Sequence, residues 1–265
     1  MRFPEQRHHG ARLSDSSADA QRDFALDDSL VIREFQEVRR ARHFQLLLAR
    51  GLAFIRHMLH KRRIVRRFPD VRVSVPAAVV IVTDSFERFL AENNLVDFAM
   101  NAADDAEIQQ RFLAAHLPAG LFADLKSFLA KARYPLAVRS SSLLEDSQYQ
   151  PFTGVYETFM LANQHADDSL RLAHRTDAIK LVYASTFSRH AKAYVRATPF
   201  RLEEEKMAVI LQQVVGAFHG PRFYPDFSGV ARSRNFYPIP PMNFEDGIAA
   251  VALGLDAPWS TAESA

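Results

Sequence analysis

The segment from Tyr134 to Met160, YPLAVRSSSLLEDSQYQPFTGVYETFM, constrains the fold more than any other part of the sequence. A short apolar strand, PLAV, is followed directly by Arg139, three serines and an acidic pair. An arginine at a strand edge is held rigidly, and its planar guanidinium suits bidentate contact with a phosphate or carboxylate. Gly154 then precedes a second strand, where it would let the backbone approach a ligand closely. These residues together are typical of an anion-binding site.

A polar turn without any ligand explains the same residues. Ser142 and Glu145 have the spacing of a capping box, in which serine and glutamate satisfy the first backbone N–H groups of a helix. In that arrangement Arg139 pairs with Glu145 or Asp146. The spacing alone leaves both interpretations open.

Length and composition limit the class of protein. A sequence of 265 residues is expected to form one large domain or two small ones, and the lack of cysteine excludes disulfides and thiolate metal sites. The longest apolar runs, such as AAVVIV at 77–82, are far short of the ~20 residues that a membrane helix needs. The N-terminal residues lack the apolar segment of a secretory signal. We therefore expect a soluble, cytoplasmic protein without a membrane partner.

The order of the patterns favours an α+β fold over a doubly wound parallel one, because helical segments dominate the first half and strands the second. Residues 1–28 are polar and are predicted to be disordered. Residues 29–133 are predicted to form a helix-rich first α+β part. Residues 134–265 are predicted to form a second part that carries the RSSS segment and a sheet and is truncated at its C-terminus.

Hydrophobic periodicity predicts the individual elements. Asp84 or Ser85 is expected to cap the second helix, and Pro118 to separate the third from the fourth. The segment 167–197 reads as one long helix or a broken pair. Helices are predicted at 29–60, 84–94, 104–117 and 120–132. Strands are predicted at 77–82, 135–138, 155–161, 207–215, 227–233 and 247–255.

Charged and metal-binding residue types give weaker signals. The segment Arg56–Arg67 holds six Lys and Arg residues, which fits either the solvated face of a helix or a surface for phosphates or RNA. The helical face is the favoured interpretation, so no nucleic-acid partner is expected. His57 and His60 lie three residues apart, but no carboxylate or third histidine accompanies them at the spacing of a metal site. No metal ligand set is predicted.

Five segments in order make the sequence resemble the phosphoenolpyruvate synthase and pyruvate phosphate dikinase family, in its N-terminal nucleotide-binding domain. That family's signature runs V-R-S-S-A-x-x-E-D and then F-A-G-x-x-[DE]-T, and this sequence has VRSSSLLED and FTGVYET at matching spacing. The other similar segments are VPAAVVIVTDSFERFL, LVYASTFSRHAKAY, MAVILQQVV and SGVARSR. The resemblance covers about residues 49–255.

The resemblance implies an ATP-grasp-like fold, in which two α+β subdomains hold ATP and Mg²⁺ in a cleft between them. It implies that Arg139 contacts the phosphates, that Gly154 and Thr158 line the nucleotide, and that Gln212 lies near the base or ribose. We therefore expect Arg139 and Gln212 to point into a common cleft. No catalytic residue is assigned.

The sequence also departs from the family. Where the family has a Gly-Gly-Lys whose lysine binds phosphate, an ungapped alignment places Leu46, Leu47 and Leu48 here. The family's downstream metal-binding glutamate, its Gln-x-Arg segment and its phosphohistidine domain have no counterpart before Ala265. The expected function is an ATP-binding domain related to dikinase-type phosphotransferases, which transfer phosphate through a carrier histidine on another domain. We expect this domain to be incomplete and weakly active or inactive alone, with a partner protein that supplies the missing domains. The alternative is a non-catalytic interaction or regulatory module that keeps the fold and has lost the nucleotide.

Overall fold

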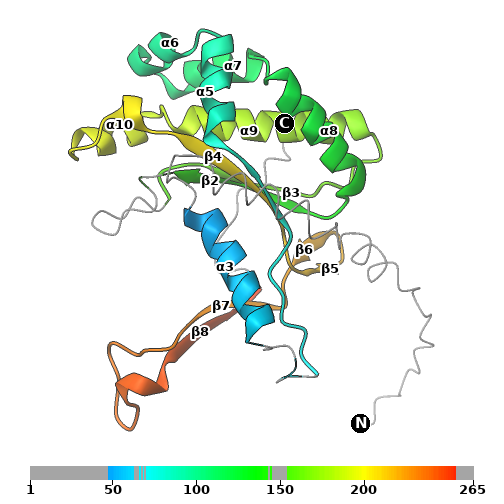
Figure 1. The fold of residues 1–265 in the computed structure, drawn as a ribbon, viewed down its shortest axis with the longest axis vertical. Helices are drawn as coiled ribbons and strands as arrows, with labels where there is room; N and C mark the ends of the chain where they lie inside the picture. Colours follow the sequence, from blue (N-terminus) through cyan, green and yellow to red (C-terminus); the bar gives the residue numbers. More distant parts are fainter. Residues whose placement is uncertain are drawn as a thin grey trace, which may run out of the picture. The chain divides into compact units, whose positions relative to one another are not determined.

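The computed structural model describes residues 47–62, 66, 68, 70–142, 144 and 154–254, and of residues 47–50, 53 and 60 only the backbone. Residues 1–28, which are predicted to be disordered, lie outside these ranges. The same holds for most of the first predicted helix and for the residues after 254. The described helices in chain order are α3 (Leu47–Lys61), α5 (Thr83–Glu92), α6 (Val96–Asn101), α7 (Asp105–Ala114), α8 (Ala119–Lys131), α9 (Asp168–Ser185) and α10 (Arg189–Arg196), with short 3-10 turns η1 (Leu202–Glu204) and η2 (Phe244–Asp246). The strands are β1 (Ala78–Ile81), β2 (Leu136–Ser142), β3 (Thr158–Leu161), β4 (Met207–Gln213), β5 (Ala217–His219), β6 (Arg222–Tyr224), β7 (Phe227–Arg232) and β8 (Ile248–Leu253). Helices and antiparallel strands occur together, which confirms the α+β prediction (Figure 1).

A four-stranded antiparallel sheet with the order β1-β4-β2-β3 forms the centre of the fold. β4 lies between two neighbours, and its first five residues, MAVIL, are all buried. β2 pairs with β4 along its whole length, from Leu136 opposite Gln213 to Ser142 opposite Met207. The predicted strand PLAV is therefore too short: Arg139 and the three serines lie within β2 instead of following it. Pairing with β4 satisfies the backbone groups of these polar residues, and this outweighs their weak preference for strands.

The two faces of this sheet differ in character, because successive residues of a strand point to opposite sides. One face packs against α5 and α9 and contributes apolar side chains to the core, so we call it the helical face. Its members in the core cluster include Ile81, Val138, Leu161, Met207, Val209 and Leu211, and the partly buried Val79 and Phe159 pack against this cluster. The opposite face carries Arg139, and we call it the arginine face. It consists of Ala78, Val80, Ala137, Arg139, Ser141, Thr158, Met160, Ala208, Ile210 and Gln212.

Helices lie on both sides of the sheet in Figure 1, with α5, α8 and α9 on one side and α3 on the other. α3 contacts β2, whereas α9 contacts β2, β3 and β4. None of the described residues of α3 belongs to the core cluster. α3 therefore lies on the side of the arginine face, outside the main core.

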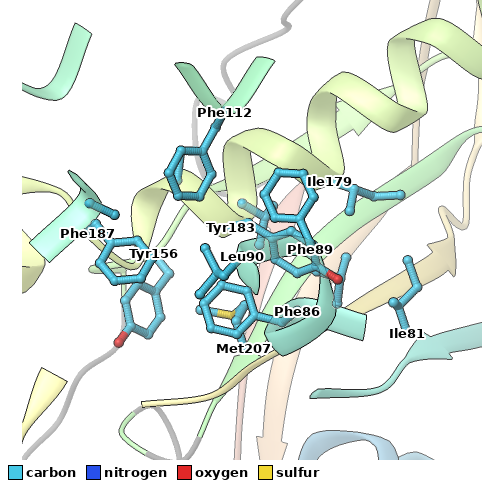
Figure 2. Packing of buried hydrophobic residues seen from close by; sticks show 14 of the residues in the cluster. Ile81, Phe86, Phe89, Leu90, Phe112, Tyr156, Ile179, Tyr183, Phe187 and Met207 are labelled. Atoms are coloured by element: carbon cyan, nitrogen blue, oxygen red, sulfur yellow. The ribbon is translucent and has the colours of Figure 1, made fainter. Parts of the chain in front are cut away.

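The core is centred on five aromatic rings from different elements (Figure 2). The Phe89 ring centroid lies 5.7 Å from that of Phe112 and 5.3 Å from that of Tyr183. The Phe86 centroid lies 5.0 Å from Tyr183 and 6.2 Å from Phe187. The Phe86–Phe187 pair is stacked and the other three pairs are tilted, and ring pairs at such separations add a favourable term to the burial of apolar area. The cluster fixes α5, α7 and α9 against the helical face.

Helix boundaries agree with the predicted breaks but not with every predicted cap. Pro118 is the N-cap of α8 and separates it from α7, as predicted. The segment 167–197 is a broken pair, because α9 ends at Ser185 and α10 begins after Ser188, whose side chain accepts from Ala191 N. The predicted cap of α5 at Asp84 or Ser85 is wrong: the N-cap is Val82, with no side-chain hydrogen bond. Asp84 lies in the first turn instead, where a carboxylate favours the helix dipole.

A buried arginine connects the helices to the beginning of β2. Arg171 on α9 is 1% exposed, and its Nη2 donates to Leu129 O at 2.9 Å and to Asp168 Oδ1 at 2.8 Å. Its Nη1 donates to Ala132 O and to Asn163 Oδ1, both at 3.1 Å. The Arg171 hydrogen bond holds the pKa of Asp168 below its usual value. This network satisfies carbonyls at the C-terminal end of α8 that would otherwise have no partner within the helix.

The C-terminal strands form two separate ribbons. β7 and β8 pair from Phe227 opposite Leu253 to Arg232 opposite Ile248, which confirms both predicted strands with slightly shorter bounds. The hairpin of β5 and β6 was not predicted from the sequence, because each strand has only three residues. Strands this short contain too few residues for alternation to be recognised.

Truncation of Phe89 tests the aromatic cluster. Phe89→Ala should lower the free energy of unfolding by about 3–5 kcal/mol, because it leaves a cavity between Phe112 and Tyr183. Phe122→Ala is the matched control, since Phe122 on α8 is 44% exposed. Urea unfolding followed by circular dichroism measures both. Equal losses in the two variants would contradict this account of the core.

Burial of Tyr134 predicts a loss of stability at alkaline pH. Burial raises the pKa of Tyr134 from 10.0 to about 12, so the folded state keeps a proton that the unfolded state releases. The contribution is therefore fully present below pH 10.0 and is lost as the pH rises to about 12. Tyr134→Phe should make the urea midpoint decline less steeply in this range, while the 89% exposed Tyr237, changed to Phe, should leave the decline unchanged. An identical decline in Tyr134→Phe and the parent would show that Tyr134 does not contribute.

Candidate functional site

Arg139 and Gln212 are in direct contact on the arginine face. Arg139 Nη1 donates a hydrogen bond to Gln212 Oε1 at 3.3 Å, and both side chains are half-buried. Arg139 lies opposite Ile210 and Gln212 lies opposite Ala137, so the two are diagonal neighbours on paired strands. Diagonal neighbours lie ~7–8 Å apart at their backbones, within reach of long side chains. The two side chains therefore lie on one face, which the predicted common cleft requires.

Thr158 extends the same group of polar residues onto a third strand. It lies directly opposite Arg139 in the pairing of β2 with β3, and its side chain is half-buried. Gln212, Arg139 and Thr158 therefore cross three adjacent strands on one face. A cation, an amide and a hydroxyl placed in this way can bind an anionic group and an adjacent polar group together.

Gly154 lies in the turn that leads into β3. Its φ of +82° is one that residues with a side chain rarely adopt, and a Cβ added there would have no heavy atom within 4 Å. The position therefore combines a conformation that favours glycine with open space beside the backbone. The structure places Gly154 four residues before Thr158, and no contact between Gly154 and Arg139 is described.

Buried polar contacts fix the segment between Gly154 and Thr158. Tyr156 is 5% exposed, and its hydroxyl donates to Glu205 Oε1 at 3.1 Å. The backbone N–H of Glu157 donates to Ser185 Oγ at 3.2 Å, at the end of α9. The start of β3 is thus attached both to α9 and to the loop before β4. Sequence reasoning missed these residues, since nothing in the spacing of Tyr156 and Glu205 indicates that they meet.

A pocket of about 410 Å³ lies elsewhere, in the helical layer, and is lined by Asn93, Leu95, Glu107, Gln110, Arg111, Ala114 and Ala115. None of the predicted site residues contributes to it. The residues that line this pocket match none of the sequence motifs. The cleft expected at Arg139 and Gln212 stays a prediction.

Several predicted features fall partly or wholly outside the described residues. Ser142 lies in β2, but Glu145 and Asp146 are not described, so the capping box remains untested. The leucines at 47 and 48 open α3, and their side chains are not described. Arg56, His57, Lys61, Arg62 and Arg66 are exposed, which agrees with a solvated helix face.

Metal-ligating residues do not gather in the described part of the chain, where no group of three or more His, Asp or Glu residues has the geometry of a metal site. Among the helices that the structure describes, none has the length and apolar character to cross a membrane.

Comparison with known protein families shows which family this chain belongs to. The sequence model of the pyruvate phosphate dikinase AMP/ATP-binding domain matches residues 57–258, which include Arg139, Gly154, Thr158 and Gln212. The chain belongs to this family. The family match spans the sheet, the helices that cover it and both ribbons.

One curated relative supports the same relationship. The chain is 27% identical over 169 residues to an uncharacterized phosphotransferase, YvkC, of Bacillus subtilis (strain 168). The alignment covers 61% of this chain but only 17% of the relative. The activity of that whole protein is therefore not carried over to this chain.

The contact of Tyr156 with Glu205 predicts a measurable coupling. Tyr156→Phe should lower the free energy of unfolding by about 1–3 kcal/mol, because a buried carboxylate loses a donor. A double-mutant cycle with Glu205→Gln, measured by urea unfolding, should give a non-additive result. Strictly additive losses would show that the two side chains do not interact in solution.

Proposed function

We propose that this chain is an ATP-binding domain in which the arginine face forms part of the nucleotide site. The observation that carries the proposal is the Arg139–Gln212 hydrogen bond at 3.3 Å, with Thr158 opposite Arg139 on the next strand. Membership in an AMP/ATP-binding domain family supports the same conclusion. An ATP-grasp-like arrangement, with the nucleotide in a cleft beside this face, belongs to the proposal.

Each residue has a chemical role in this proposal. Arg139 contacts phosphate oxygens, because its guanidinium keeps its charge and can donate two parallel hydrogen bonds. Gln212 both donates and accepts, which suits the edge of a base or a ribose hydroxyl. Thr158 offers a hydroxyl beside Arg139, and Gly154 leaves space for a ligand to approach the backbone.

Mg²⁺ fits this proposal as a companion of the nucleotide. This ion keeps several waters and is bound through one or two carboxylates together with substrate phosphates. A dedicated cluster of protein ligands is therefore not needed to bring it to the site. Bound there, it would neutralise phosphate charge.

We expect the proposed site to bind the phosphates of ATP weakly. In an alignment without gaps, Leu46, Leu47 and Leu48 stand where the family carries a Gly-Gly-Lys with a phosphate-binding lysine. Loss of one charge-assisted contact costs roughly 1.5–3 kcal/mol, or about one to two decades in affinity. We propose phosphoryl transfer of the dikinase type, towards a carrier histidine on another domain or on a partner protein, as the reaction to which this domain is related. On its own the chain should have weak activity or none.

A non-catalytic interaction module is the second candidate. It is favoured by the sequence at 46–48, where three leucines stand in place of the family's Gly-Gly-Lys in an alignment without gaps. The exposed basic residues from Arg56 onward would then meet a partner.

Calorimetric titration with Mg-ATP tests the proposal. Arg139→Ala should weaken ATP binding by about one to two decades, because one charge-assisted contact is lost. Arg88→Ala is the matched control, since Arg88 pairs with Glu92 on the exposed side of α5 and should leave the affinity unchanged. Absence of binding heat at millimolar ATP from a folded parent protein would overturn the proposal and favour the interaction module.

A further inference from the structure

Ser141 has a buried hydroxyl that nothing in the described part of the chain satisfies. Its side chain lies in β2 and the residue is 2% exposed. Its Oγ has no hydrogen-bond partner among the described residues. A buried hydroxyl left in this state costs about 1–3 kcal/mol, so an unsatisfied one in the middle of a strand requires an explanation.

The position of Ser141 connects it to the candidate site. It lies two residues after Arg139 on the same strand and therefore on the same face of the sheet. Ala208 is opposite Ser141 in β4 and offers no polar side chain. The neighbouring serines, Ser140 and Ser142, lie on the helical face, and neither lacks an interaction.

Other buried hydroxyls without a partner in the described residues do not share this position. Tyr183 lies within the aromatic cluster, and Thr186 lies at the end of α9. Both belong to α9 or its C-cap, and α9 lies on the far side of the sheet from α3. Ser228 lies in the separate β7–β8 ribbon. Of these groups, Ser141 is the one on the arginine face.

We propose that the Ser141 hydroxyl donates a hydrogen bond to a phosphate oxygen of the nucleotide, beyond the phosphate that Arg139 contacts. The order along the face supports a phosphate over a base or ribose: Gln212 lies opposite Ala137, Arg139 comes next, and Ser141 follows on the far side of Arg139. A nucleotide with its base end at Gln212 extends its phosphates towards Ser141. This inference rests on the proposed function, and it separates Ser141 from the two neighbouring serines, which the sequence alone treats as one group.

The burial of Ser141 affects both the strength of the proposed hydrogen bond to phosphate and the access of the ligand to it. A hydrogen bond to a charged oxygen is stronger where water is excluded, as it is around Ser141. Because the hydroxyl is covered before a ligand arrives, the cover over this end of the face must open when the phosphates enter. α3 is the described helix that contacts β2 from this side.

Paired serine variants of the full chain test the inference. Ser141→Ala should bind Mg-ATP about tenfold more weakly than the parent, which corresponds to the loss of one hydrogen bond to a charged group. Its affinity for adenosine, which has no phosphate, should be unchanged. Ser140→Ala, which removes a buried hydroxyl from the opposite face of the same strand, should bind both ligands like the parent. Circular dichroism confirms that each variant is folded.

The outcomes separate this inference from the proposed function. ATP binding by the parent together with equal ATP affinity in Ser141→Ala and Ser140→Ala would overturn the role of Ser141 and leave the nucleotide site intact. Equal weakening of ATP and adenosine by Ser141→Ala would overturn the assignment to phosphate. No ATP binding by the folded parent would overturn both proposals. If Ser141→Ala does not fold, Ser141→Cys, which keeps the size but donates weakly, replaces it and should show the same selective loss.

Discussion

The pairing of β2 with β4 is the interaction on which the remaining structure depends. These two strands run side by side from Leu136 opposite Gln213 to Ser142 opposite Met207, and they occupy the two central positions of the sheet. Their helical face supplies Val138, Val209 and Leu211 to the core. Their other face holds Arg139 next to Gln212, residues 73 positions apart in sequence. A single set of backbone hydrogen bonds therefore positions both the core and the candidate site.

The core and the site are joined by buried polar residues as well as by the sheet. Arg171 binds the carbonyls of Leu129 and Ala132, so the end of α8 is held where the chain turns into β2. Tyr156 and Ser185 hold the start of β3 in a similar way. Buried arginine and tyrosine side chains are tolerated because their polar atoms are hydrogen-bonded. Removing one partner leaves the other buried without a hydrogen bond, and this destabilises the folded state. The polar contacts therefore define where the strands begin, while the apolar residues hold the layers together.

Sequence reasoning recovered most of the elements but not their connections. Periodicity identified the helices around Phe112 and Ile179 and the central strand at Met207–Gln213, because long elements repeat their pattern. It ended β2 at Val138, because arginine and serine are poor strand formers, and only the partner strand shows why they continue it. Resemblance to a family gave Arg139, Thr158 and Gln212, which the sheet does place on one face. The sequence named the three serines after Arg139 but did not show that Ser141 alone shares the arginine face, because this depends on β2 continuing as a strand. The Tyr156–Glu205 contact was missed, because local spacing does not predict contacts between distant residues.

The hydrogen bond between Arg139 and Gln212 limits how freely the Arg139 side chain moves. A guanidinium with no partner would sample many rotamers, and a ligand would have to select one of them at an entropic cost. The amide oxygen of Gln212 reduces the number of rotamers by binding the guanidinium. Because the amide is neutral, this hydrogen bond is weaker than an ion pair with a carboxylate would be. In the proposed site, an anion would replace this neutral acceptor and would not have to break an ion pair. In that proposal, Gln212 would restrict the arginine before the ligand binds and would reduce the entropy lost on binding.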